Sequence, residues 1–330
     1  MVRLKLAGKY LIRALGLILI IISLNFLLIH LMPGDPLVHI LGEEEYFTLA
    51  SQYPEVLEEI RSDYSLDGSI LEQYFRYLWQ TAHLRFGNSY ANGQDVVQKV
   101  LFRMKWTMVL SVTAILISAV VGGVLGLLAG YRKGSRLDSG LTFFFLLLET
   151  IPANCLALIT LVIFSFKLRW FPMGGMSSGN LTGFAWLLDT VYHMVLPVSV
   201  LSLFKTSSNF LLMKSFASQI REEEFIAIAV AKGLPKGKVI FQHLLKNVLA
   251  PYLTMLCIQF GHILSGSMLV EVVFSWKGMG TLIYNGVITR DYPTVQLCFL
   301  LIAVCVILFN FLSEVLCMWI DPRLKEAHHA

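Results

Sequence analysis

The stretch from Trp106 to Tyr131 reads WTMVLSVTAILISAVVGGVLGLLAGY and contains no acidic or basic residue. An α-helix rises about 1.5 Å per residue, so roughly 20 mostly apolar residues cross the hydrocarbon core of a bilayer. The stretch exceeds that length and predicts a membrane-spanning helix. Within it, Gly122, Gly126 and Gly130 recur every fourth residue. A stripe of small residues at this spacing is typical of close helix packing in lipid.

Five further apolar stretches are long enough to cross a membrane. One of them contains Glu149, and another is interrupted by Lys205. In chain order, the expected spans are 14–32, 106–131, 139–166, 190–213, 247–270 and 292–320. The sequence therefore predicts an all-α membrane protein with six transmembrane helices.

The composition of the whole chain agrees with lipid as its solvent. Of 330 residues, 56% are hydrophobic and 15% are charged, and the mean hydropathy is +0.68. Globular proteins carry roughly 25% charged residues, so an ordinary cytosolic enzyme is excluded. The net charge of +4 is too small to indicate a nucleic-acid partner. The five cysteines lie in apolar stretches without a C-x-x-C pair, and we interpret them as packing or lipid-facing residues.

The distribution of lysine and arginine predicts the orientation. If residues 1–13 are cytoplasmic and the first apolar stretch is a retained helix, the cytoplasmic segments, with Lys205 counted among them, hold 16 basic residues and the short outer segments hold 4. Basic residues concentrate on the cytoplasmic side of membrane proteins. The loop 214–246 and the tail 321–330 are then cytoplasmic as well. Residues 33–105 lie outside, with 11 acidic and 6 basic residues. Two short amphipathic helices, 54–60 and 71–79, are expected in this small extracytoplasmic subdomain.

Common catalytic motifs are absent from this sequence or lack their usual context. There is no Walker A pattern and no H-E-x-x-H, so neither nucleotide binding by that route nor a zinc protease is predicted. A G-x-S-x-G occurs from Gly175 to Gly179, but no strand precedes it and no helix follows, and we interpret it as a turn. A membrane-embedded hydrolase would need a base near Ser177, for which His193 is the nearby candidate. We assign no catalytic residue and no metal site.

The most informative polar segment is the loop 214–246. Three acidic residues, Glu222 to Glu224, precede the apolar run Phe225 to Lys232, and Gly233 and Pro235 follow it. Acidic residues at the start, a lysine in the last turn and a glycine in the left-handed cap predict a short helix that ends before the proline. Its apolar residues are typical of a docking surface for a cytosolic partner. The alternative is a helix that lies on the membrane surface.

A second helical run is expected from Lys236 to Leu249. The spacing of four residues places Val239, His243 and Asn247 on one face of that run. Elsewhere, Glu149 is costly in hydrocarbon and is expected to face the interior of the bundle. There it either lines a path or pairs at a kink near Pro152.

Characteristic motifs occur along nearly the whole chain. They are Leu31-Met32-Pro33-Gly34-Asp35-Pro36, Leu84 to Ser89, His193 to Pro197, Ala229-x-Ala231-Lys232-Gly233-Leu234, His243-x-Leu245-Lys246-Asn247 with Pro251, Glu271 to Gly280, Arg290 to Gln296, and Asp321-Pro322-Arg323. Together these motifs resemble one known family, the B-type permeases of binding-protein-dependent ABC importers for dipeptides, oligopeptides and nickel. The chain departs from the family pattern at Ala227 and Val230, where arginine is frequent, and at Lys277, where proline is usual.

The resemblance implies a type I importer permease in the bacterial inner membrane. Its partners would be a C-type permease, two ATPase subunits that bind ATP and Mg²⁺, and an extracytoplasmic solute-binding protein. The chain itself would hold no cofactor. The loop that engages the ATPase would include Glu224, Ala229, Ala231, Lys232, Gly233, Leu234, His243 and Asn247. Glu149 and Glu271 are candidates for the translocation path.

The substrate stays open between short peptides, which we favour, and nickel or a metal chelate. A metal path would use imidazole or thioether groups, and no second histidine lies at helical spacing from His30, His193 or His262. An ion-driven transporter would bury paired charges in the membrane, and Glu149 with Lys205 does not form such a relay.

Overall fold

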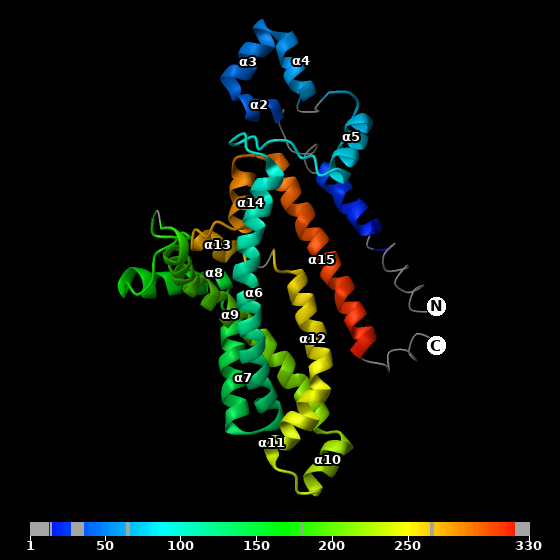
Figure 1. Cartoon of the computed structure of the whole chain (residues 1–330), viewed down its shortest axis with the longest axis vertical. Coiled ribbons are helices and arrows are strands. Elements are labelled where there is room, and N and C mark those ends of the chain that lie inside the picture. The colour runs from blue at the N-terminus through cyan, green and yellow to red at the C-terminus, as the bar shows by residue number, and fades with distance from the viewer. Residues whose placement is uncertain are drawn as a thin grey trace. The chain divides into compact units, whose positions relative to one another are not determined.

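The computed structural model describes residues 13, 15–27, 36–63, 67–179, 181–264 and 267–320. Within these ranges the regular structure is helical, apart from one isolated β-bridge between Asn88 and Asp95 (Figure 1). The all-α class predicted from the sequence is therefore confirmed. The chain divides into two compact units, Met1–Met104 with Leu282–Val304 and Lys105–Thr281 with Cys305–Ala330. Residues 1–12, the tail 321–330, His30 and the motif residues 31–35 lie outside the described ranges.

The count of spans differs from the expected six among the described residues. Four helices are long and apolar enough to cross a membrane: Val96–Tyr131, Gly183–Arg221, Lys236–Gly261 and Tyr292–Ser313. A fifth span results if Arg136–Glu149 and Ala153–Lys167 form one bent pair. The first expected span, 14–32, is described only as the apolar helix Leu15–Leu27, which is shorter than a full crossing.

The first unit contains the expected outer helices. Helices α4 (Pro54–Asp63) and α5 (Ile70–Ala82) confirm the two amphipathic segments predicted there. Two further short helices, α2 (Pro36–Leu41) and α3 (Glu43–Gln52), precede them. Helix α5 begins with a reciprocal capping box, because the Ser69 hydroxyl accepts from the Glu72 amide while the Glu72 carboxylate accepts from the Ser69 amide.

A buried carboxylate fixes the start of α15 (Tyr292–Ile320) within this unit. Asp291 accepts hydrogen bonds from the Ser89 hydroxyl at 2.5 Å, the Thr294 hydroxyl at 2.7 Å and the Lys99 ammonium at 3.1 Å. Burial by itself raises the pKa of Asp291, but these donors outweigh it and hold the pKa below its usual range. The motif Arg290 to Gln296 and the motif Leu84 to Ser89, distant in sequence, thus meet at one carboxylate.

In the second unit, the glycine stripe of α6 (Val96–Tyr131) packs against α9 (Gly183–Arg221). A Cβ atom added at Gly126 would lie 2.5 Å from the carbonyl oxygen of Phe210. One added at Gly130 would lie 2.6 Å from the Cβ of Ala217, and one at Gly122 would lie 2.8 Å from the Cβ of Asn209. The predicted packing role is confirmed, and its partner is α9.

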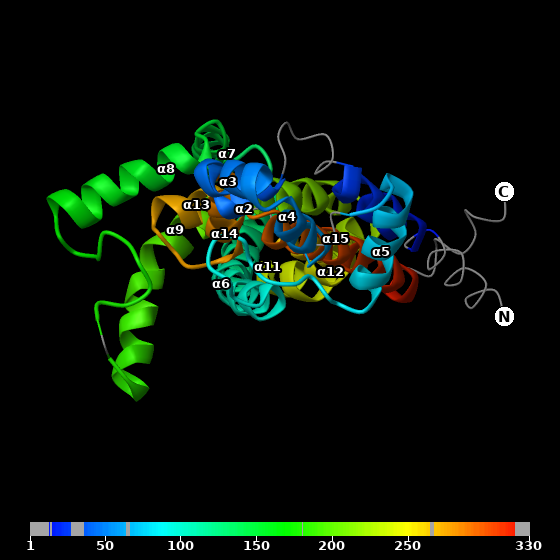
Figure 2. The same ribbon diagram turned by 90° about the horizontal axis from the view of Figure 1, so that it is seen from above.

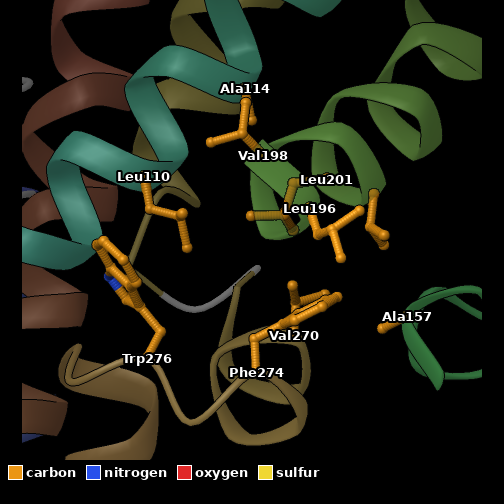
Figure 3. Close-up of a cluster of buried hydrophobic side chains, with 10 residues drawn as sticks. Leu110, Ala114, Ala157, Leu196, Val198, Leu201, Val270, Phe274 and Trp276 are labelled. Atoms are coloured by element: carbon orange, nitrogen blue, oxygen red, sulfur yellow. The ribbon is translucent and has the colours of Figure 1, made fainter. Parts of the chain in front are cut away.

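A buried cluster holds α6, α9 and α13 (Met268–Val273) together in this unit. Figure 3 shows Leu110 of α6, Leu196 and Leu201 of α9, and Val270 turned toward one another beside Trp276. The Trp276 indole is fully buried, and its N–H donates to the carbonyl oxygen of Trp106. The motif that begins at Glu271 therefore contributes to the core of the unit.

The expected single span 139–166 is broken. Helix α7 (Arg136–Glu149) ends at Thr150, and α8 (Ala153–Thr160) with the π-helix η1 (Leu161–Lys167) continues at an angle of 94°. In Figure 2, α7 is seen nearly end-on, whereas α8 lies along the plane of the picture. Pro152 is the physical reason, because its ring removes an amide donor and blocks the preceding helical turn.

Three other helices differ in length from the expected spans. Helix α9 extends beyond 190–213 at both ends. Lys205 interrupts the hydropathy of this segment, but the helix continues through it. Helix α6 starts at Val96, before the expected start at 106. The expected span 247–270 is displaced toward the loop, because α12 (Leu245–Gly261) continues helical structure that starts at Lys236 and ends before α13.

Candidate functional site

The predicted short helix in the loop 214–246 is α10 (Glu224–Ala231), and its ends follow the expected rules. Glu224 lies in the first turn, where its charge favours the helix dipole. Lys232 is the C-terminal capping residue, and Gly233 follows with a φ of +75°. The amide of Gly233 donates to the carbonyl of Val230 at 2.9 Å, which satisfies one of the free carbonyls at the helix end.

One face of α10 attaches it to the bundle. Ile226 and Ala229 are buried in a cluster with residues of α6, α9 and α12, and Leu234 packs against the same cluster. In α9 the cluster takes Met213 and Ala217. A displacement of α10 would therefore push directly on the C-terminal part of α9.

The other face of α10 stays uncovered. Phe225, Ile228 and Val230 are 40%, 54% and 53% exposed, although they belong to a polar loop. Exposed large apolar side chains are typical of a surface that contacts another protein or a membrane. At about 100° per residue, Phe225 and Ile228 share one side of the helix, whereas Val230 lies on the side of the hollow described next. The surface formed by Phe225 and Ile228 is called the docking face below.

A basic hollow lies beside α10. It has a volume of about 680 Å³, and its apolar floor includes Ala227, Val230 and Ala231. The lining cations, which come from the ends of neighbouring helices, are Arg132, Lys133, Arg221 and Lys236. One anion is close, since Glu222 pairs with Lys133 at 2.5 Å, but both side chains are exposed and such a pair contributes little. The cations in the lining therefore outnumber this one paired anion.

Sequence reasoning missed these four cations as a group. Their positions along the chain indicate the orientation in the membrane, whereas the structure places each of them at a helix end next to α10. Their clustering at those ends of the predicted helices that are expected to be cytoplasmic is the signal that could have identified them. Two departures from the family pattern, Ala227 and Val230, lie on the floor of the same hollow.

The second helical run differs from its expected face. A π-helical turn, η2 (Val239–Leu244), separates α11 (Lys236–Lys238) from α12. This wide turn inserts one residue, so the buried row runs through Val239, Leu244 and Val248. Asn247 is exposed, and its amide donates to the carbonyl of His243 at 2.7 Å.

Polar residues also meet inside the bundle. The Asn209 amide of α9 donates to the Ser118 hydroxyl of α6 at 3.0 Å, and the Asn209 carbonyl accepts from Gln259 of α12 at 2.7 Å. All three helices are candidate spans, and polar side chains of this kind hydrogen-bond across packed helices in membranes. Sequence reasoning missed the network because no local pattern shows which polar residues of three separate helices meet.

The two carboxylates expected to line a path have different surroundings. Glu149 is exposed at the end of α7 and accepts a hydrogen bond from the Ser208 hydroxyl at 3.3 Å, next to the break at Pro152. Glu271 is fully buried and accepts from Thr107 and from the backbone of Gly280. The structure does not bring the two carboxylates to one site.

The arrangement around Ser177 lacks the contacts of a hydrolase. The Ser177 hydroxyl donates to the carbonyl of Gly179, and Asp189 binds both the amide and the hydroxyl of Ser178. The His193 Nδ1 lies 2.8 Å from the Asp189 carbonyl oxygen and 3.6 Å from its carboxylate. The Ser177 hydroxyl is bonded to a backbone carbonyl and not to the imidazole, whereas a nucleophile activated by histidine donates to the imidazole. Among the described residues no group of three or more His, Cys, Asp or Glu side chains is arranged to hold a metal ion.

Comparisons with known proteins agree with the transport interpretation. Residues 122–326 match the family described as binding-protein-dependent transport system inner membrane component. A di/tripeptide transport system permease protein of Pseudomonas aeruginosa is 31% identical in an alignment that covers 96% of this chain and 98% of that protein. An oligopeptide transport system permease protein of Haemophilus influenzae is 32% identical over 98% of this chain and 99% of its own length. A putative peptide transport system permease protein of Brucella abortus is 30% identical over 96% of this chain and 98% of its own length.

Proposed function

Because this chain belongs to the family of binding-protein-dependent transport system inner membrane components, we propose that it is the B-type permease subunit of an ATP-driven importer of di- or oligopeptides. It is a multi-pass inner membrane protein and works with a solute-binding protein. The remaining partners are a C-type permease and two cytosolic ATPases, which bind ATP and Mg²⁺ in place of this chain.

The observation that carries the mechanism is α10, a short helix with one face buried in the bundle and the docking face exposed. Closing of the ATPases on ATP pushes the docking face, and Ile226 and Ala229 transmit the displacement to Met213 and Ala217 of α9. Rotation of the helices then opens the path toward the binding protein. The ATPase subunits supply the energy, so the permease needs no catalytic side chain. The basic hollow beside α10 orients the ATPase through its acidic groups.

The coupling role predicts a specific effect of Gly233→Val. Valine is strongly disfavoured at a φ of +75°, and the added Cβ meets no neighbouring atom within 4 Å, so backbone strain is the main direct effect. We expect the end of α10 to shift and substrate-stimulated ATP hydrolysis by the reconstituted complex to fall several-fold, while membrane insertion persists.

Gly237→Val is the matched control for this experiment. Gly237 lies in the same loop, is exposed, has open space around it and does not need a positive φ. We expect this variant to retain coupling. Full coupling in Gly233→Val would contradict the assignment of α10, and equal loss in both variants would show that the loop is merely intolerant of valine.

The substrate assignment rests on the names of the relatives, which are peptide, di/tripeptide and oligopeptide permeases. In agreement, the described histidines do not gather into a ligand set that suits nickel. A strain that lacks the permease should fail to grow on a required dipeptide and should recover when the gene is restored. Uptake of radioactive nickel should not change. Normal growth on the peptide with loss of nickel uptake would establish the alternative.

A further inference from the structure

Helix α5 divides its surface into three faces. At about 100° per residue, Tyr74, Tyr77 and Thr81 share the first face. This face packs on the apolar helix Leu15–Leu27: the Tyr74 hydroxyl lies 2.6 Å from the Ser23 hydroxyl, and the Phe26 ring lies 5.3 Å from the Tyr74 ring. Ser23 and Phe26 precede the end of an apolar stretch that runs to residue 32 in the sequence. The contact therefore holds α5 near the level at which that stretch leaves the hydrocarbon.

The second face is apolar and uncovered. Leu71, Phe75 and Trp79 follow one another every four residues and are 69%, 66% and 52% exposed. Leu78 and Ala82 lie on the same side of the helix. Three large apolar side chains in a row would be costly in water, since each Å² of apolar surface removed from water stabilises by about 25 cal/mol.

The third face is polar and adjoins the second. Glu72, Arg76 and Gln80 also recur every four residues. Arg76 pairs with Asp67, and Glu72 caps the helix through Ser69, so both charges are used locally. Helix α5 thus has an apolar face and a polar face in addition to the face that packs on protein. Separate apolar and polar faces are typical of a helix that lies in a membrane interface.

We propose that α5 lies in the extracytoplasmic interface of the membrane with Leu71, Phe75 and Trp79 immersed among lipid acyl chains. The apolar face continues the exposed, lipid-compatible surface of the helix Leu15–Leu27, whose Leu24 and Leu27 are also exposed. Trp79 suits the headgroup level, where aromatic residues collect. The Arg85 guanidinium lies 5.2 Å from the Trp79 ring centre, where it can reach lipid phosphates.

Lipid is a better occupant of this face than the solute-binding protein. A binding protein docks and leaves in each transport cycle, so a face reserved for it would return to water between visits. Lipid covers the face permanently. The interface helix would thereby anchor the extracytoplasmic subdomain at a fixed height above the bilayer, whichever substrate the importer carries.

Spin labels on single cysteines test the proposal in the complete complex reconstituted in lipid nanodiscs. In a background without native cysteines, labels at Leu71→Cys and Phe75→Cys are compared with the polar-face control Gln80→Cys. We expect lipid-soluble oxygen to relax the first two labels several-fold more than a water-soluble nickel chelate does, and the order to reverse at Gln80. Water accessibility at all three positions would overturn the proposal.

A second measurement avoids removal of the native cysteines. Benzoylphenylalanine in place of Phe75 keeps an aromatic side chain and is photoactivated in the same nanodiscs. An adduct with the mass of a phospholipid is expected. An adduct with the second permease or with the solute-binding protein would overturn the proposal and identify the apolar face as a protein interface.

Discussion

Gly126→Ala is expected to destabilise the membrane bundle, although alanine favours a helix more than glycine does. The new Cβ would lie 2.5 Å from the carbonyl oxygen of Phe210 and 2.9 Å from the Cβ of Met213 in α9. Backbone atoms cannot move aside by a rotamer change, so α6 and α9 must separate. Overpacking of this kind costs about 1–3 kcal/mol of stability. The higher helix propensity of alanine stabilises the helix by only about 0.5–1 kcal/mol. The Tm of the purified complex should therefore fall.

Two other glycines provide controls for this prediction. Gly140 in α7 has no heavy atom within 4 Å of its added Cβ, so Gly140→Ala should leave the Tm unchanged or raise it. Gly123, on another side of α6, would place its Cβ 3.2 Å from the Tyr252 hydroxyl, a longer approach than that of Gly126 and to a side chain instead of the backbone. Gly123→Ala should be intermediate. The same Tm for Gly126→Ala and Gly140→Ala would contradict the close packing of α6 on α9.

Local signals explain why some elements could be predicted from the sequence. The spacing of Gly122, Gly126 and Gly130 is visible within one helix, so their packing role could be inferred without knowledge of the partner. The end of α10 was predictable because Gly233 suits the left-handed conformation of a helix cap and Pro235 cannot continue a helix. Helices α4 and α5 were predictable from their periodic apolar residues. In each case the deciding interactions lie within one or two turns of the chain.

Other features depend on contacts that no local pattern contains. The hydropathy of 139–166 is continuous, so it hides the 94° bend even though Pro152 is visible in the sequence. The π-helical turn at Val239 shifts the buried row by one residue and leaves no mark in composition. In α10, the exposure of Ile228 and the burial of Ile226 differ only because one of them meets α9 and α12. The loop could be identified from its residues, but its buried and exposed faces required the tertiary structure.

Glu271 shows most clearly how distant residues decide the role of a motif. The sequence suggests that its carboxylate lines a path, whereas the structure surrounds it with donors. Its Oε1 accepts from the hydroxyls of Thr107 and Ser267 at 2.7 and 2.8 Å. Its Oε2 accepts from the amides of Gly280 and Thr281 at 2.7 and 3.3 Å, at the start of α14 (Met279–Ile288). Burial raises the pKa of Glu271, and these donors oppose that effect.

The glycines of the same motif leave room for this carboxylate. A Cβ added at Gly278 would collide with Oε2 of Glu271, and one added at Gly280 would lie 2.5 Å from the Cα of Met268. The sequence Glu271 to Gly280 therefore forms one unit, in which a carboxylate caps the start of α14 and ties it to α6 through Thr107. Its two oxygens are occupied by internal donors, which favours an anchoring role over contact with a substrate.

Glu271→Ala is consequently expected to lower both stability and transport strongly. The substitution leaves four donors in a fully buried site, and each unsatisfied buried group costs about 1–3 kcal/mol. Glu271→Gln should be milder, because the amide oxygen can accept from the backbone amides while its NH₂ group faces hydroxyls that can turn to accept.

Thr107→Val should lose part of the same free energy, and its effect should not add to that of Glu271→Gln, since the two side chains share a hydrogen bond. Thermal unfolding of the complex and peptide uptake per folded complex separate the two roles. If Glu271→Gln unfolds like the wild type but no longer transports peptide, the carboxylate acts in the path and the anchoring role is wrong.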